Sequence, residues 1–168
     1  MANTTFSGPV RSESTLKTVS KNSSTGAITE VTTLGDGPVS LSDGDVTLTN
    51  ATHSGRVLLV PDGGQDNTYT LPAPIAGSVF RFVYAGGAAD ATDAIILTPG
   101  NTNFFVGGVT FLDTDNEVSA VFSDGNSNSK IQLNVPAGFD VTIIGKDTTN
   151  YQIFGNVTGA TAPEFADQ

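Results

Sequence analysis

Short runs of alternating apolar and polar residues, each ended by a glycine or proline turn, constrain the fold of this chain more than any other feature. After Asp45, Val46 and Leu48 alternate with polar neighbours, and Ile131 and Leu133 do the same further along. This two-residue period is typical of strands with one face towards a core and the other towards water. The runs predict strands at residues 46–50, 55–60, 67–71, 78–84, 93–98, 103–106, 109–112, 117–122, 130–135 and 140–154, the last as two strands.

The composition favours the same class of fold. Only 14% of the residues are charged, so the side chains that usually cover a solvated helix are scarce, whereas 19 glycines and 8 prolines supply many tight turns. We therefore predict an all-β fold, an antiparallel β-sandwich or a jelly-roll-like domain with an extended N-terminal arm. No repeat of roughly 20–50 residues is visible, which argues against a solenoid.

The chain is expected to have three parts. Residues 1–42 are rich in Ser and Thr and hold only isolated apolar side chains. Such a segment buries too little apolar surface to offset the entropy lost on ordering, so it is either disordered or laid along a partner as an arm. Residues 43–159 form the predicted β-sandwich, and residues 160–168 form a short C-terminal tail.

Charge restricts the possible partners. The net charge is −10, divided between residues 1–29, with three basic residues and one acidic, and residues 30–168, with four basic and sixteen acidic. So acidic a body would be repelled by phosphate, and we expect it to bind neither nucleic acid nor a membrane. The chain has no Cys for a disulfide, no apolar run of the ~20 residues that span a bilayer, and no signal-peptide pattern at its start, so synthesis in a host cytoplasm is expected.

His53 is the only histidine, and a Ser-His-Asp arrangement would have to use it. No Gly-x-Ser-x-Gly motif accompanies it, and the stretch from Asn50 to Gly55 is typical of a hairpin turn. We therefore expect no catalytic residues and predict that the protein is not an enzyme.

Asp113, Asp115 and Glu117 form an acidic run with a two-residue spacing. On one strand face they could hold a cation or act as a hydrolytic pair, whereas in a loop they are only a solvated turn. Asp124 and the residues to Asn128 likewise place Asp and Asn at alternate positions, but the glycine position and the missing Glu do not match a calcium loop. We predict turns at both places, with no metal and no cofactor.

Aromatic residues line one predicted strand, where Phe80, Phe82 and Tyr84 share a face and are expected in the core. Arg81, on the opposite face, would need a carboxylate or carbonyl partner if buried, or would lie at a subunit interface. The adjacent pair Phe104-Phe105 sends one ring to each face of its strand, so one ring must meet solvent or a partner.

Three stretches of the sequence resemble structural proteins of tailed phages. The start, MANTTFSGPVRSE followed by TVSKNSSTGA, resembles small virion proteins of marine and cyanobacterial phages. The block TLPAPIAGSVFRFV and the ending YQIFGNV, with its Thr/Ala/Pro tail, are similar to head decoration proteins. These strings cover about a quarter of the chain.

The resemblance implies a capsid decoration or cement protein on the outer surface of the virion, which stabilises the head by binding the major capsid protein, usually as a homotrimer, through its arm. An alternative is a receptor-binding or carbohydrate-binding module of a head fibre, spike or tail fibre. The residues expected at a capsid or subunit interface are Phe6, Val10, Arg11, Leu16, Lys17, Lys21, Arg81, Phe105 and Phe165.

Overall fold

A computed structural model describes residues 18–31, 37–87, 89–115 and 117–168. The chain divides into two compact units between Gly37 and Pro38. The second unit therefore begins slightly before the boundary expected at residue 43, because Val39 and Ser40 already form a strand of the sandwich.

The described part of the first unit is a hairpin of β1 (Thr18–Lys21) and β2 (Ile28–Val31). Its turn is closed by Asn22, whose backbone N–H donates to the Ala27 carbonyl at 2.9 Å. Gly26 adopts a φ of +72°, which the turn requires and a glycine tolerates. This stretch of the expected arm is thus a β-hairpin.

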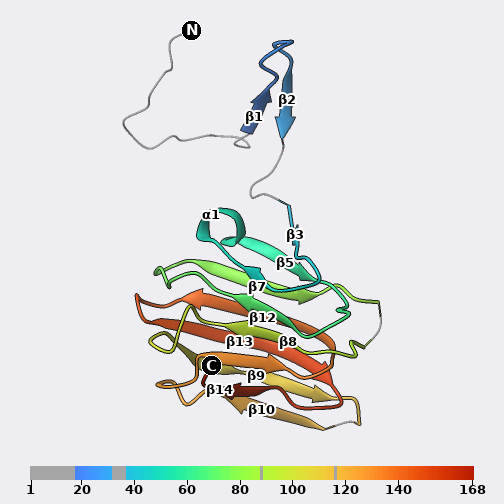
Figure 1. The fold of residues 1–168 in the computed structure, drawn as a ribbon, viewed down its shortest axis with the longest axis vertical. Helices are drawn as coiled ribbons and strands as arrows, with labels where there is room; N and C mark the ends of the chain where they lie inside the picture. Colours follow the sequence, from blue (N-terminus) through green and yellow to red (C-terminus); the bar gives the residue numbers. More distant parts are fainter. Residues whose placement is uncertain (1–17, 32–36, 88, 116) are drawn as a thin grey trace. The chain divides into compact units, whose positions relative to one another are not determined.

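Two β-sheets form the second unit, which confirms the predicted all-β sandwich. The seven-stranded sheet contains, in spatial order, β10 (Val118–Phe122), β9 (Phe104–Asp113), β13 (Asn150–Gly159), β12 (Pro136–Gly145), β7 (Val79–Tyr84), β5 (Arg56–Val60) and β3 (Val39–Ser40). The five-stranded sheet contains β14 (Glu164–Ala166), β11 (Lys130–Leu133), β8 (Ala94–Leu97), β6 (Asn67–Thr70) and β4 (Val46–Thr47). Figure 1 shows the larger sheet stacked from β3 at one end to β10 at the other.

The sheets are mixed rather than purely antiparallel. The chain passes alternately from one sheet to the other, so that β3, β5 and β7 stack in parallel in the larger sheet and β4, β6 and β8 in the smaller one. This part is a short solenoid, contrary to the expectation from the lack of a visible repeat. Its strands in the larger sheet begin at residues 39, 56 and 79, so the unequal loops hide any fixed period. β12 and β11 then pair antiparallel with β7 and β8 and end the parallel stack.

An aspartate ladder, made of Asp45, Asp66 and Asp93, joins successive coils. Each of these residues directly precedes a strand of the smaller sheet, and its Oδ1 accepts a hydrogen bond from a backbone N–H of the next layer. The bonds come from Thr68, Asp93 and Val135, each at 2.9 Å. The ladder thus satisfies one backbone donor at the start of β6 and two that lie just outside strands, at Asp93 and Val135.

The core lies between the two sheets and is aromatic. As predicted, Phe80 and Phe82 are buried, and Tyr84 is half-buried against the core. The Phe80 ring lies 6.3 Å from that of Tyr151, whose hydroxyl donates to the Pro72 carbonyl at 2.8 Å. Burial of the phenol raises the pKa of Tyr151, so it remains a hydrogen-bond donor at neutral pH.

Two predicted turns are absent. Gly107-Gly108, the break between the predicted strands 103–106 and 109–112, lies inside the continuous strand β9. Gly107 has a φ of +105° there, and the carbonyl oxygen of Ile153 would lie 2.4 Å from a Cβ, so the glycine allows the neighbouring strand β13 to lie close. Pro136 to Gly138, which lie between the predicted strands 130–135 and 140–154, begin β12 with a β-bulge.

The stretch around His53 forms a one-turn helix, α1 (Asn50–His53), instead of the predicted hairpin turn. Thr49 caps it, because its hydroxyl accepts the Thr52 N–H at 3.3 Å. His53 Nδ1 accepts the Thr49 N–H at 2.9 Å, so the only histidine of the chain has a structural contact within the described residues.

Candidate functional site

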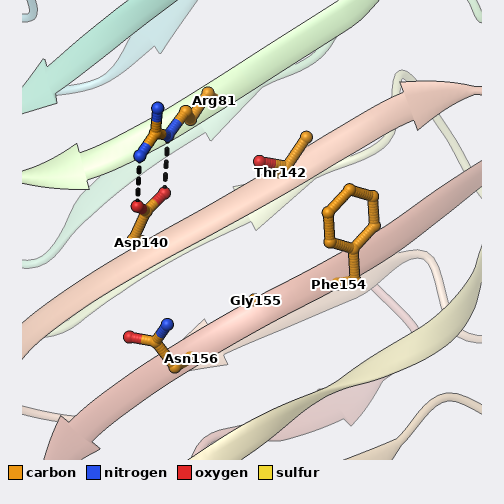
Figure 2. Close-up of a pocket in the computed structure, with 6 residues that line it drawn as sticks. All are labelled: Arg81, Asp140, Thr142, Phe154, Gly155 and Asn156. Carbon is orange, nitrogen blue, oxygen red and sulfur yellow. Dashed lines mark hydrogen bonds and ion pairs between the residues drawn. The ribbon is translucent and has the colours of Figure 1, made fainter.

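A shallow depression lies on the outer face of the seven-stranded sheet, across three neighbouring strands (Figure 2). Its volume is about 310 Å³. The lining residues are Arg81 from β7, Asp140 and Thr142 from β12, and Phe154, Gly155 and Asn156 from β13. The register explains their proximity, because Thr142 is paired with Arg81 on one side and with Phe154 on the other, while Asp140 is paired with Asn156.

Arg81 and Asp140 form a bidentate ion pair at one end of the depression (Figure 2). Arg81 Nε donates to Asp140 Oδ1 at 2.8 Å, and a terminal guanidinium nitrogen donates to Oδ2. The hydrogen bonds from Arg81 lower the pKa of the Asp140 carboxyl, and Asp140 raises the pKa of the guanidinium. The carboxylate partner expected for Arg81 is therefore present, although the side chain is 50% exposed rather than buried.

Phe154 supplies an apolar wall opposite the ion pair (Figure 2). Its side chain is 48% exposed, whereas its neighbour Ile153 is fully buried. Next to it, Gly155 has a φ of +150°, and its missing side chain lets β13 approach the Asp140 carbonyl. Gly155 therefore has no side chain that could fill the depression between the ring and the ion pair.

Such an arrangement can bind a small polar ligand that also has an apolar face. The ring presents a flat apolar surface, the Asn156 amide offers both a donor and an acceptor, and the outer edge of the ion pair is open to solvent. Sequence reasoning found only Arg81 among these residues. The adjacent pair Ile153-Phe154 was a usable signal, because one of two successive apolar side chains on a strand must face outwards.

Phe105 was predicted at an interface, and the structure corrects this. The side chain is fully buried in the chain's own core, with its ring 6.3 Å from the ring of Tyr151 and 6.3 Å from that of Phe165. Phe165 is held by β14, which pairs with β11, so it packs on the same core and is only partly accessible. The Phe105 ring therefore cannot reach a partner without opening the sandwich, whereas a role of Phe165 at an interface stays a prediction.

The other predicted interface residues belong to the first unit. Phe6, Val10, Arg11, Leu16 and Lys17 lie outside the described residues, and of Lys21 only the backbone in β1 is described. Their role at an interface stays a prediction.

The acidic run occupies the turn between β9 and β10. The Asp113 N–H donates to the Glu117 carbonyl, and the Asp113 carboxylate accepts the Asp115 N–H, both at 2.9 Å. The carboxylate of Asp124 similarly accepts from three backbone N–H groups, Asn126 to Asn128, and from the Ser127 hydroxyl. The Ser127 and backbone hydrogen bonds lower the pKa of Asp124. Both acidic loops are thus organised by their own backbone.

Within residues 18–31, 37–87, 89–115 and 117–168, no three His, Cys, Asp or Glu side chains are grouped closely enough to hold a metal ion. No helix in those same stretches is long and apolar enough to cross a membrane.

No protein-family model matches the chain, and no curated protein is significantly similar to it. The chain is thus a two-sheet β-sandwich that contains a short parallel solenoid. The outer face of its larger sheet carries an open depression with polar and aromatic lining residues.

Proposed function

We propose that the protein is a structural component of a tailed-phage virion, a decoration protein that binds the outer surface of the capsid and stabilises the head. The observation that supports this most is the division of the chain at Gly37 into two units of different charge. Residues 38–168 carry fourteen acidic and four basic residues, whereas the other three basic residues, Arg11, Lys17 and Lys21, all precede the division.

The physical basis of the proposal is a division of tasks. A self-contained acidic sandwich carries charge of one sign, which favours solubility and opposes non-specific association of copies, since like charges repel. The first unit, relatively basic in its first 29 residues, would supply the attachment, and many copies on a repeating lattice would multiply a modest affinity. The homotrimer implied by the resemblance stays a prediction.

The test is co-sedimentation of the full chain with heads of the phage that encodes it, followed by imaging of the decorated heads. We expect binding to the shell, loss of binding when residues 2–20 are deleted, and weaker binding after Lys17→Ala with Lys21→Ala. The matched control is Lys130→Ala with Lys146→Ala in the sandwich, which should bind normally. Full binding by the deletion variant, or location of the protein in the tail, would contradict the proposal.

A second candidate function is carbohydrate binding at the depression, favoured by the exposed Phe154 ring beside Asn156 and the Arg81–Asp140 pair. Sugars combine a C–H face, which packs on an aromatic ring, with hydroxyls that bond to amides and ion pairs. A glycan array probed with the full chain tests it. Phe154→Ala should abolish any signal, whereas Phe122→Ala, which removes an even more exposed ring elsewhere, should not. No binding to any glycan, or the same loss in both variants, would exclude this role.

A further inference from the structure

The edges of the two large sheets are unequal. In the described sandwich, β3, β4 and β14 are edge strands of two, two and three residues, whereas the edge strand β10 has five. Natural sheets usually keep their edges short or charged, because unpaired N–H and C=O groups attract another strand. β10 is the edge where this protection is weakest.

β10 is also uncharged and largely exposed. Its sequence is VSAVF, in a unit of net charge −10. Val118 is 70% exposed and Phe122 is 72% exposed, the two largest values among the big hydrophobic side chains of the described residues. Both lie on the same face as Ala120, and the register places Leu112 of β9 beside Val118. An apolar strip therefore follows this edge.

The hydrogen bonds to β9 show which backbone groups of β10 remain available. The Asp113 N–H donates to the Glu117 carbonyl, and the Ser123 N–H donates to the Gly107 carbonyl, both at 2.9 Å. In an antiparallel ladder the bonded residues alternate. The backbone N–H and C=O groups of the odd-numbered residues of β10 therefore point towards β9, and those of the even-numbered residues point away from it. Val118, Ala120 and Phe122 therefore direct their N–H and C=O groups to the free edge, where no described strand pairs with them.

We propose that β10 pairs antiparallel with β10 of a second copy of this chain, around a two-fold axis at Ala120. This register places Ala120 opposite Ala120 and Val118 opposite Phe122 of the second copy, and it uses every outward N–H and C=O of these three residues. The exposed apolar side chains then meet each other on one face of a continuous sheet. A two-fold contact of this kind is self-complementary and closes as a dimer.

The charges around the strand agree with this register. Glu117, at the start of β10, would lie opposite Ser123 of the second copy instead of another carboxylate, so no like charges oppose each other directly. The two bodies nevertheless repel at longer range, because each carries a net charge of −10. Two five-residue strands form a contact smaller than the roughly 1,600 Å² of a standard interface, so we expect dissociation in the micromolar range and tighter pairing at higher salt.

Sedimentation velocity of the full chain over a range of concentrations tests the proposal. We expect a reversible monomer–dimer equilibrium that shifts towards dimer as NaCl is raised. Ala120→Pro removes an N–H that β9 does not use, and Val118→Lys adds a charge to the strip; each should raise the dissociation constant at least tenfold. The matched control is Ile75→Lys, which alters a side chain that is 55% exposed elsewhere and should leave the equilibrium unchanged.

Circular dichroism and thermal melting of each variant distinguish loss of pairing from loss of folding. If the Ala120→Pro variant does not fold, Val118→Lys still tests the proposal. A monomer at every concentration overturns the proposal. That is the result expected if β10 is instead covered by residues 1–37 or serves to bind another protein. A trimer, or equal effects of Val118→Lys and Ile75→Lys, overturns it as well.

Discussion

At Gly155, β13 lies so close to β12 that a side chain does not fit. A Cβ there would lie 2.2 Å from the carbonyl oxygen of Asp140 and 2.8 Å from Cα of Val141, and the φ of +150° is one that other residues rarely adopt. Gly155 also lines the depression beside Phe154, so this residue links the packing of the sheet to the shape of the depression.

We predict that Gly155→Ala destabilises the protein by about 2–4 kcal/mol, because the backbone must move to relieve the clash. Urea unfolding measured by circular dichroism provides the free energy of unfolding. The control is Gly138→Ala, where nothing lies within 4 Å of the added Cβ and φ is not positive, so the change should be within about 1 kcal/mol of zero. Equal stability of the two variants would show that the strands can separate freely at Gly155.

Arg81 should control the titration of Asp140. Its hydrogen bonds place the pKa of Asp140 below the ordinary value of 3.8, so the pair stabilises the folded state at pH values above 3.8. This stabilisation is lost as the pH falls through the lowered pKa. A carboxyl-detected NMR titration should show the Asp140 pKa rising towards 3.8 in Arg81→Gln, while the pKa of Asp147, which Asn150 and its backbone lower, stays unchanged. An Asp140 pKa that does not move in Arg81→Gln would contradict the assigned cause.

At the level of the strands, the aspartate ladder explains how strands that are joined by loops of unequal length stay in register. Asp93 is its most connected member, because it accepts the Val135 N–H at 2.9 Å and the Gln132 amide at 2.7 Å. Val135 has a φ of +35°, unusual for a β-branched residue, and the Asp93 bond holds its N–H at the point where β11 leads into β12.

We predict that Asp93→Ala lowers the free energy of unfolding by about 1–3 kcal/mol, since it leaves partly buried donors without an acceptor. Chemical denaturation measures this, with the exposed residue Asp62 as control: Asp62→Ala removes the same charge from the acidic body and should be neutral or slightly stabilising. If both variants behave alike, the ladder does not contribute to stability.

For the whole molecule, the excess of acidic residues predicts electrostatic self-repulsion. The net charge of −10 opposes compaction because like charges repel. Salt weakens this repulsion, since the screening length falls to about 10 Å at 0.1 M. We expect NaCl to raise the melting temperature of the full chain by a few degrees and the effect to level off above roughly 0.3 M. Differential scanning calorimetry checks this, and a melting temperature independent of NaCl would show that the charges are too far apart to matter.

The alternation of apolar residues and the turn residues determined that the chain is all-β, where most strands lie, and that Phe80 and Phe82 belong to the core, because these properties follow from local periodicity. In the sequence, Asp45, Asp66 and Asp93 each stand directly before a strand, but their structural role depends on hydrogen bonds with the next coil. Only the tertiary structure decided that Gly107-Gly108 continues a strand, that Phe105 is internal, and that Phe154, Asp140 and Asn156 meet at one site. Strand order and direction arise from pairings between residues far apart in the sequence. The two-residue period of a strand is the same whichever other strand lies beside it, so it does not reveal the pairing.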